Sequence, residues 1–137
     1  MSNHAAKISS LEKDISSLSH NIKDTQSKIA ELKKAKTAIT GELHTLSNNA
    51  TLINQPDITS HIWNGRHTNQ FINIRSNIAH SYQNIQRETD GLISHIEQEI
   101  ENLEMQISNM EMFLSIQKQQ LTDIKNKSII EVKEWQK

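Results

Sequence analysis

The stretch ISSLEKDISSLSHNIKDTQSKIAELKKAKTAITGELHTL, residues 8–46, decides the fold because its apolar residues recur every seven positions. Two interleaved sets form one stripe, and ten of their twelve members are apolar. The first set is Ile8, Ile15, Ile22, Ile29, Lys36 and Leu43, and the second is Leu11, Leu18, Thr25, Leu32, Ile39 and Leu46. A stripe with alternating steps of three and four residues predicts a long helix that buries a narrow seam against another helix.

A second stripe with steps of three and four residues runs through the C-terminal half, where no proline follows Pro56. A bend, if this helix has one, is expected at Gly91, since glycine costs about 1 kcal/mol relative to alanine inside a helix. We predict one long second helix. The members of its stripe are Phe71, Ile74, Ile78, Tyr82, Ile85, Leu92, Ile96, Ile100, Leu103, Ile107, Met110, Leu114, Leu121 and Ile124.

The segment between the two stripes contains residues that end helices. The side chains of Ser47-Asn48-Asn49 compete for backbone hydrogen bonds, and Pro56 disfavours a helical Gln55. The sequence therefore predicts an all-α fold, an antiparallel, coiled-coil-like two-helix hairpin with a longer second helix. The expected single domain, residues 1–137, has a first helix over about 5–48, a link over about 49–65 and a second helix over about 66–135.

The composition excludes several classes of protein. Fifteen basic and sixteen acidic residues give a net charge of −1, which argues against binding to nucleic-acid phosphates. The absence of cysteine excludes disulfides, thiol catalysis and cysteine-ligated zinc. Apolar runs of two or three residues are too short to span a membrane, and the N-terminal MSNHAAKISSLEKD does not have the pattern of a secretory signal peptide.

The sequence contains no pattern of catalytic, cofactor-binding or metal-binding residues. None of its seven histidines forms a His-x-x-x-His or Glu-x-x-His pair that would place two ligands on one helical face. Glu97 and Glu101 are four residues apart on a helix, but no partner base accompanies them. Because a phosphate-binding glycine loop and a nucleophile elbow are also missing, we expect a protein that is not an enzyme and has no cofactor.

The unequal helix lengths predict an interaction surface. Placing Leu46 near Phe71 at the tip would put Ile8 beside about Asn109, so that the second helix has no partner beyond about Met112. An apolar stripe left uncovered there would be unfavourable in water and is expected to bind another chain. Met105, Met110 and Met112 are candidates for an adaptable surface where this overhang begins; the alternative for Met110, which lies on the stripe, is a plain seam residue. The residues predicted to bind a partner are Met110, Leu114, Leu121, Ile124, Ile129, Val132 and Trp135.

The sequence SHIWNGRHTNQFINI, residues 60–74, is unusual for a coiled coil because it contains a tryptophan and a glycine. We expect Trp63 to cover the last apolar layer at the hairpin tip, close to Phe71. Gly65 would allow the backbone to turn there or to pack closely. These three residues form the predicted tip motif.

The order of these segments resembles the WXG superfamily, and most closely the YwqH-like family of small helical proteins encoded beside LXG-domain toxins of Gram-positive bacteria. The matching segments are ISSLEKDISSLSHNIKDTQSKIAELKKA, then PDITSHIWNGRHTNQFINIR, then LISHIEQEIENLEMQISNMEMFLS. Trp63 and Gly65 are the residues that match the family motif.

The resemblance implies a targeting factor or chaperone that binds the helical N-terminal LXG domain of a cognate toxin and supports type VII secretion. The implied partners are that toxin, a second small helical helper in a hetero-oligomer, and the secretion machinery. From the charge and the short apolar runs, neither nucleic-acid binding nor membrane insertion is expected. The implied location is the cytoplasm before export, with secretion alongside the toxin as a further expectation.

The sequence departs from the pattern of type VII substrates at one point. Many of these proteins carry a Tyr-x-x-x-Asp/Glu signal. Here the residue four positions after Tyr82 is Gln86, and the residue four positions after Phe113 is Gln117, so the acidic member is missing. The alternative reading is a self-associating coiled-coil protein, structural or scaffolding, in which the C-terminal tails pair with each other.

Overall fold

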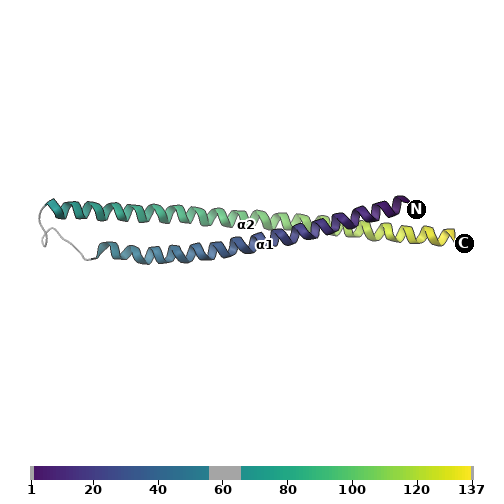
Figure 1. Ribbon diagram of the computed structural model, residues 1–137, viewed down its shortest axis with the longest axis horizontal. Helices are drawn as coiled ribbons and strands as arrows, with labels where there is room; N and C mark the ends of the chain where they lie inside the picture. The colour runs from purple at the N-terminus through teal and green to yellow at the C-terminus, as the bar shows by residue number, and fades with distance from the viewer. Residues whose placement is uncertain (1, 56–65, 137) are drawn as a thin grey trace. The chain divides into compact units, whose positions relative to one another are not determined.

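The computed structural model describes residues 2–55 and 66–136, and the chain is helical through nearly all of them. Helix α1 spans Ser2–Ala50, a short 3-10 helix η1 spans Thr51–Asn54, and helix α2 spans Arg66–Trp135 (Figure 1). The prediction of an all-α antiparallel hairpin with a longer second helix is confirmed. Helix α1 extends past the expected range of about 5–48 at both ends. Helix α2 passes through Gly91 as one uninterrupted element.

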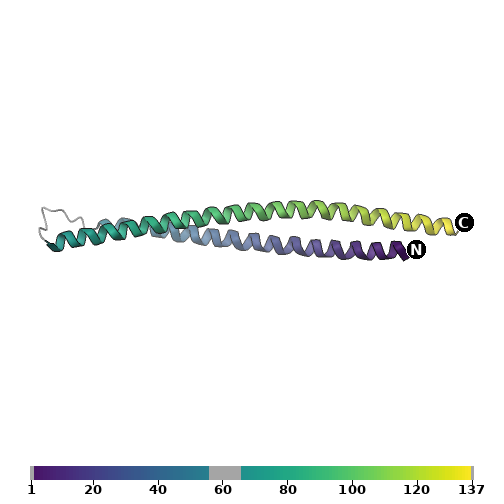
Figure 2. The ribbon, with the colours of Figure 1, turned by 90° about the horizontal axis from the view of Figure 1, so that it is seen from above.

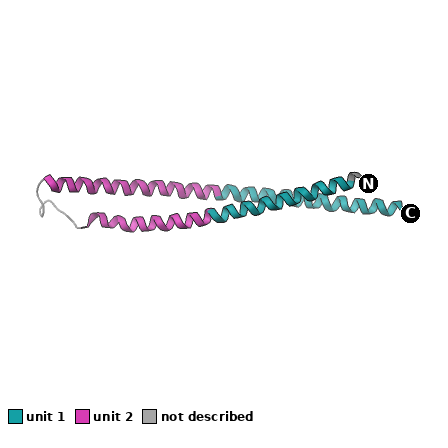
Figure 3. Cartoon of the chain, in the orientation of Figure 1, with its two compact units in different colours: residues 1–31, 100–137 teal, residues 32–99 magenta. Residues whose placement is uncertain are grey.

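The chain divides into two compact units, each made of one α1 segment packed against one α2 segment of opposite direction (Figure 3). Unit 1 comprises residues 1–31 and 100–137, and unit 2 comprises residues 32–99. Each unit therefore holds part of the seam that the heptad pattern predicts.

Unit 1 contains the buried core. Its buried apolar side chains are Ile22 and Ile29 from α1 and Ile100 and Leu103 from α2, each 8% exposed. Thr25, one of the two polar residues in the first stripe, is also buried, and its hydroxyl donates a 2.8 Å hydrogen bond to the backbone carbonyl of Asn21. This bond satisfies the hydroxyl, so a threonine is tolerated in the seam. All twelve residues of the first stripe are buried or half-buried, as the heptads predict.

The register of unit 1 differs from the one predicted. The His4 ring lies 3.0 Å from the Glu131 carboxylate, and the Lys125 ammonium lies 3.5 Å from the Glu12 carboxylate. The start of α1 thus lies about five helical turns further along α2 than expected. The prediction that α2 has no partner beyond about Met112 is therefore wrong, because α1 runs beside it as far as Glu131.

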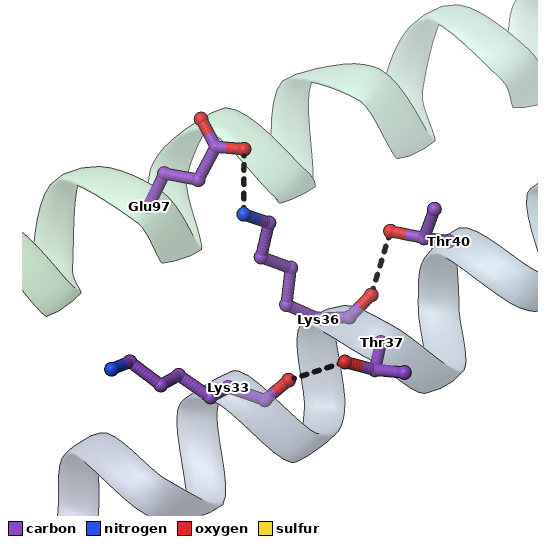
Figure 4. A network of polar contacts seen from close by, with 5 residues as sticks. All are labelled: Lys33, Lys36, Thr37, Thr40 and Glu97. Carbon is purple, nitrogen blue, oxygen red and sulfur yellow. Dashed lines mark hydrogen bonds and ion pairs between the residues drawn. The ribbon is translucent and has the colours of Figure 1, made fainter.

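Unit 2 has a similarly shifted register. The Lys36 ammonium lies 3.1 Å from the Glu97 carboxylate of α2 (Figure 4). Lys36, the other polar residue of the first stripe, is half-buried; a lysine can keep its stem against the seam while its charge stays in water. Such a partly exposed ion pair contributes about 0–1 kcal/mol, so it favours a register more than it stabilises the hairpin.

The start of α2 extends beyond the end of α1 within unit 2 (Figures 1 and 2). Leu46 lines a hollow with Ala79 and Tyr82, whereas the prediction placed it near Phe71. The predicted register placed Leu46 and Phe71 level at the tip. The link between the helices is about as long as predicted, since α1 ends at Ala50 and α2 begins at Arg66. The register differs because the first turns of α2 lie past the end of α1.

Candidate interaction surfaces

Most of the large apolar side chains that stay exposed in the described part of the chain lie on helix α2. Among the described residues, only four apolar side chains are buried, whereas fifteen large ones are exposed. All of these fifteen except Leu52 belong to α2. Large apolar side chains gathered on one element mark surfaces that meet another chain. Three such surfaces can be defined.

The first surface is the uncovered seam of unit 2, which we define as Phe71, Ile74 and Ile78. These side chains belong to the predicted stripe of α2, lie past the end of α1 beside the half-buried Arg75 and Ala79, and are 43%, 58% and 44% exposed. A shallow hollow lies between them and Ile53, and the Arg75 guanidinium lies 4.8 Å from the centre of the Phe71 ring. Phe71 of the predicted tip motif thus belongs to this surface. Trp63 and Gly65 lie outside the described residues.

The second surface is an open groove in unit 2, which we call the unit 2 groove. Ile39, Leu43 and Leu46 of α1 line one side of it. Ile85 and Leu92 of α2 line the other side and are 47% and 49% exposed. Its volume is about 410 Å³. Ile93, which is not in the predicted stripe, is half-buried, whereas the stripe member Leu92 is 49% exposed. The covered face of α2 therefore passes through Ile93 at this level.

The third surface is the outer patch of unit 1, which we define as Met105, Met112, Phe113 and Ile116. Their side chains are 64%, 64%, 61% and 47% exposed. Met105, Met112 and Ile116 follow each other at steps of seven and four residues, so they share one face of α2. This face lies away from the seam residues Ile107, Met110 and Leu114. The spacing from Met105 was the signal that could have identified Ile116 from the sequence.

The predicted partner-binding residues divide into two groups. Met110, Leu114, Leu121 and Ile124 are half-buried, and Ile124 lines a shallow groove together with Leu11 of α1. Ile129, Val132 and Trp135 are 54%, 39% and 86% exposed. The reason given for this site, an α2 segment without a partner, is wrong. Binding of another chain by these residues stays a prediction.

Gln117 is a polar residue in the seam of unit 1. It is half-buried, and its side-chain carbonyl oxygen is buried without a hydrogen-bond partner among the described residues. Replacing Gln117 by leucine is expected to stabilise the hairpin by about 1–2 kcal/mol, because an unpaired buried carbonyl is removed and apolar surface is added. Urea unfolding followed by circular dichroism measures this gain. Gln106→Leu, at an exposed position of the same segment, is the matched control, and an equal gain there would contradict the explanation.

Within residues 2–55 and 66–136, no three or more His, Cys, Asp or Glu side chains gather in a group that could hold a metal ion. No helix in this part of the chain is long and apolar enough to cross a membrane.

Comparison with curated proteins found no match, and comparison with solved structures found none either. A family model does match, and it covers residues 6–126. This range includes both helical stripes, the link between them, and the outer patch. The chain therefore belongs to the YwqH-like family.

Proposed function

We propose that this protein is a non-enzymatic targeting factor or chaperone that binds the helical LXG domain of a cognate toxin and supports its export by type VII secretion. Membership of the YwqH-like family supports this proposal. The observation that carries it is the outer patch, where Met105, Met112, Phe113 and Ile116 are each 47–64% exposed on one helix.

The chemistry of the outer patch fits a helical partner. Methionine side chains are flexible and polarizable, so they adapt to the apolar ridge of another helix. Two carboxylates, Glu101 and Glu111, lie on exposed positions of the same segment and would favour a partner helix with basic residues along its edge. Burying this patch against a toxin domain would at the same time cover apolar surface of that domain, which is what a chaperone provides.

Changing Met112 and Ile116 together to aspartate tests the proposal. The double variant is expected to weaken binding to the LXG domain encoded by the neighbouring gene at least about 100-fold, because two charges would be buried in an apolar interface. Co-expression followed by affinity purification and titration calorimetry measures the binding. These positions are preferable to Leu121 and Ile124, which are half-buried within the hairpin itself.

The matched control is Ser115→Asp with Thr122→Asp, which adds the same charge at exposed positions of the same helix. This control is expected to bind like the original chain. Full binding by the Met112→Asp/Ile116→Asp variant would exclude the outer patch as the toxin-binding surface. Absence of binding by the original chain would reject the proposed function.

A further inference from the structure

We propose that two copies of this chain pair through unit 2, with the uncovered seam of each copy lying in the unit 2 groove of the other. This inference uses a different surface from the outer patch and does not rest on the proposed function.

The two surfaces are complementary. The uncovered seam is one helix whose apolar residues have no α1 segment opposite them, since α1 ends at Ala50. The groove is a pair of helices whose apolar residues, among them Ile85 and Leu92, remain about half exposed. A third helix lying in such a groove would cover both sets of side chains. Because both surfaces are on the same chain, a second copy can satisfy them reciprocally, as a symmetric dimer does.

The sequence of α2 is symmetric in the way that antiparallel self-pairing requires. Phe71, Ile78, Ile85 and Leu92 are exposed and follow each other at steps of seven residues. A two-fold axis between Ser81 and Tyr82 brings Phe71 opposite Leu92 of the second copy and Ile78 opposite Ile85. The contact region then runs from residue 71 to residue 92, about 32 Å of helix at about 1.5 Å per residue.

The charges follow the same symmetry. The axis that pairs the apolar residues also brings Arg75 opposite Glu88 of the second copy. Residues 66–87 include three arginines and no acidic residue, whereas the groove is flanked by Glu42, Glu88 and Asp90, all exposed. A basic segment thus approaches an acidic one in both halves of the dimer, which fixes the antiparallel direction. Parallel pairing would place Arg75 opposite Arg75 of the second copy, and the repulsion between the two charges disfavours it.

Charge reversal with rescue tests the pairing. The original chain is expected to sediment with twice the 15.7 kDa mass of one chain. Arg75→Glu and Glu88→Arg, made separately, should each weaken the dimer about tenfold, since two attractive pairs become repulsive. The double variant Arg75→Glu/Glu88→Arg should restore the original dissociation constant. The rescue cannot arise within one chain, because these residues are 13 positions, or about 20 Å, apart along the helix.

A cross-linking experiment tests the position of the axis. The chain has no cysteine, so Ser81→Cys introduces a single thiol beside the proposed axis and is expected to form a disulfide-linked dimer on mild oxidation. The control is Ser76→Cys, an exposed position on the other face of α2 from Ile78, and it should remain monomeric in non-reducing electrophoresis. A chain that is monomeric in sedimentation would overturn the proposal and assign these surfaces to a different protein. Equal cross-linking at both positions, or no rescue by the double charge reversal, would overturn it as well.

Discussion

Replacing Ile100 by alanine is expected to lower the free energy of unfolding of the hairpin by about 2–4 kcal/mol. Ile100 is one of only four apolar side chains that are buried among the described residues. The loss includes the transfer of its methylene and methyl groups and the cavity left behind. Two packed helices have no deeper layer that could collapse into that cavity. Since the free energy of unfolding of small proteins is only about 5–15 kcal/mol, this single change would remove a large share of it.

The matched control is Ile130→Ala, the same substitution in the same helix and the same unit. Ile130 is 56% exposed, so its truncation should cost less than about 0.5 kcal/mol. Urea unfolding followed by circular dichroism compares the two variants. Similar losses at both positions would mean that the core is not centred on Ile22, Ile29, Ile100 and Leu103.

The two-helix fold was predictable because the hydrophobic period marks both helices. The second stripe was assigned less accurately than the first, since Ile85 and Leu92 are 47% and 49% exposed while Ile93 is half-buried. All twelve residues of the first stripe are buried or half-buried, including both polar exceptions. The Thr25 hydroxyl donates a hydrogen bond to the backbone carbonyl of Asn21 in its own helix, and the Lys36 ammonium forms an ion pair with Glu97. Thr37 and Thr40 show the same local solution on the exposed side of α1, where each hydroxyl donates to the carbonyl four residues earlier (Figure 4). A periodic pattern tolerates such residues when their polar atoms find a partner.

The register was not predictable from the same pattern, because a heptad repeat fits equally well after a shift by a whole number of heptads. The predicted register places Leu46 and Phe71 level at the tip, and nothing in the heptads requires the two helices to be level there. Interhelical ion pairs such as Glu12 with Lys125 are individually weak, but they identify the register once the structure is known.

The interaction surfaces were predicted only in part, as a consequence of this register. The sequence predicts an apolar segment of α2 without an α1 partner, beyond about Met112. The unpaired end, however, is the start of α2, at Phe71, Ile74 and Ile78, and not its C-terminal segment. The Met105 and Met112 positions were noted as an adaptable surface, and both are 64% exposed. Phe113 and Ile116 lie away from the seam, so the heptad pattern does not identify them.

Removing residues 113–137 is expected to cause the largest loss of stability, about 5 kcal/mol or more. In the observed register this segment packs against the start of α1, where Glu12 meets Lys125 and Leu11 lines a groove with Ile124. Its removal would expose the apolar residues of α1 from Ile8 to Leu18 as well as removing their partners. Thermal unfolding measures the loss, and hydrogen exchange should place it in the first turns of α1.

The shorter truncation that removes only residues 134–137 is the control. It deletes Trp135, which is 86% exposed, and should leave the melting temperature nearly unchanged. The register first predicted from the sequence gives the opposite expectation, since there Ile8 lies beside about Asn109 and residues 113–137 touch nothing in α1. A chain ending at Met112 that melts like the full chain, with the start of α1 still protected from exchange, would therefore restore that register. Such a result would also mean that residues 113–137 form an unpaired, partner-binding tail.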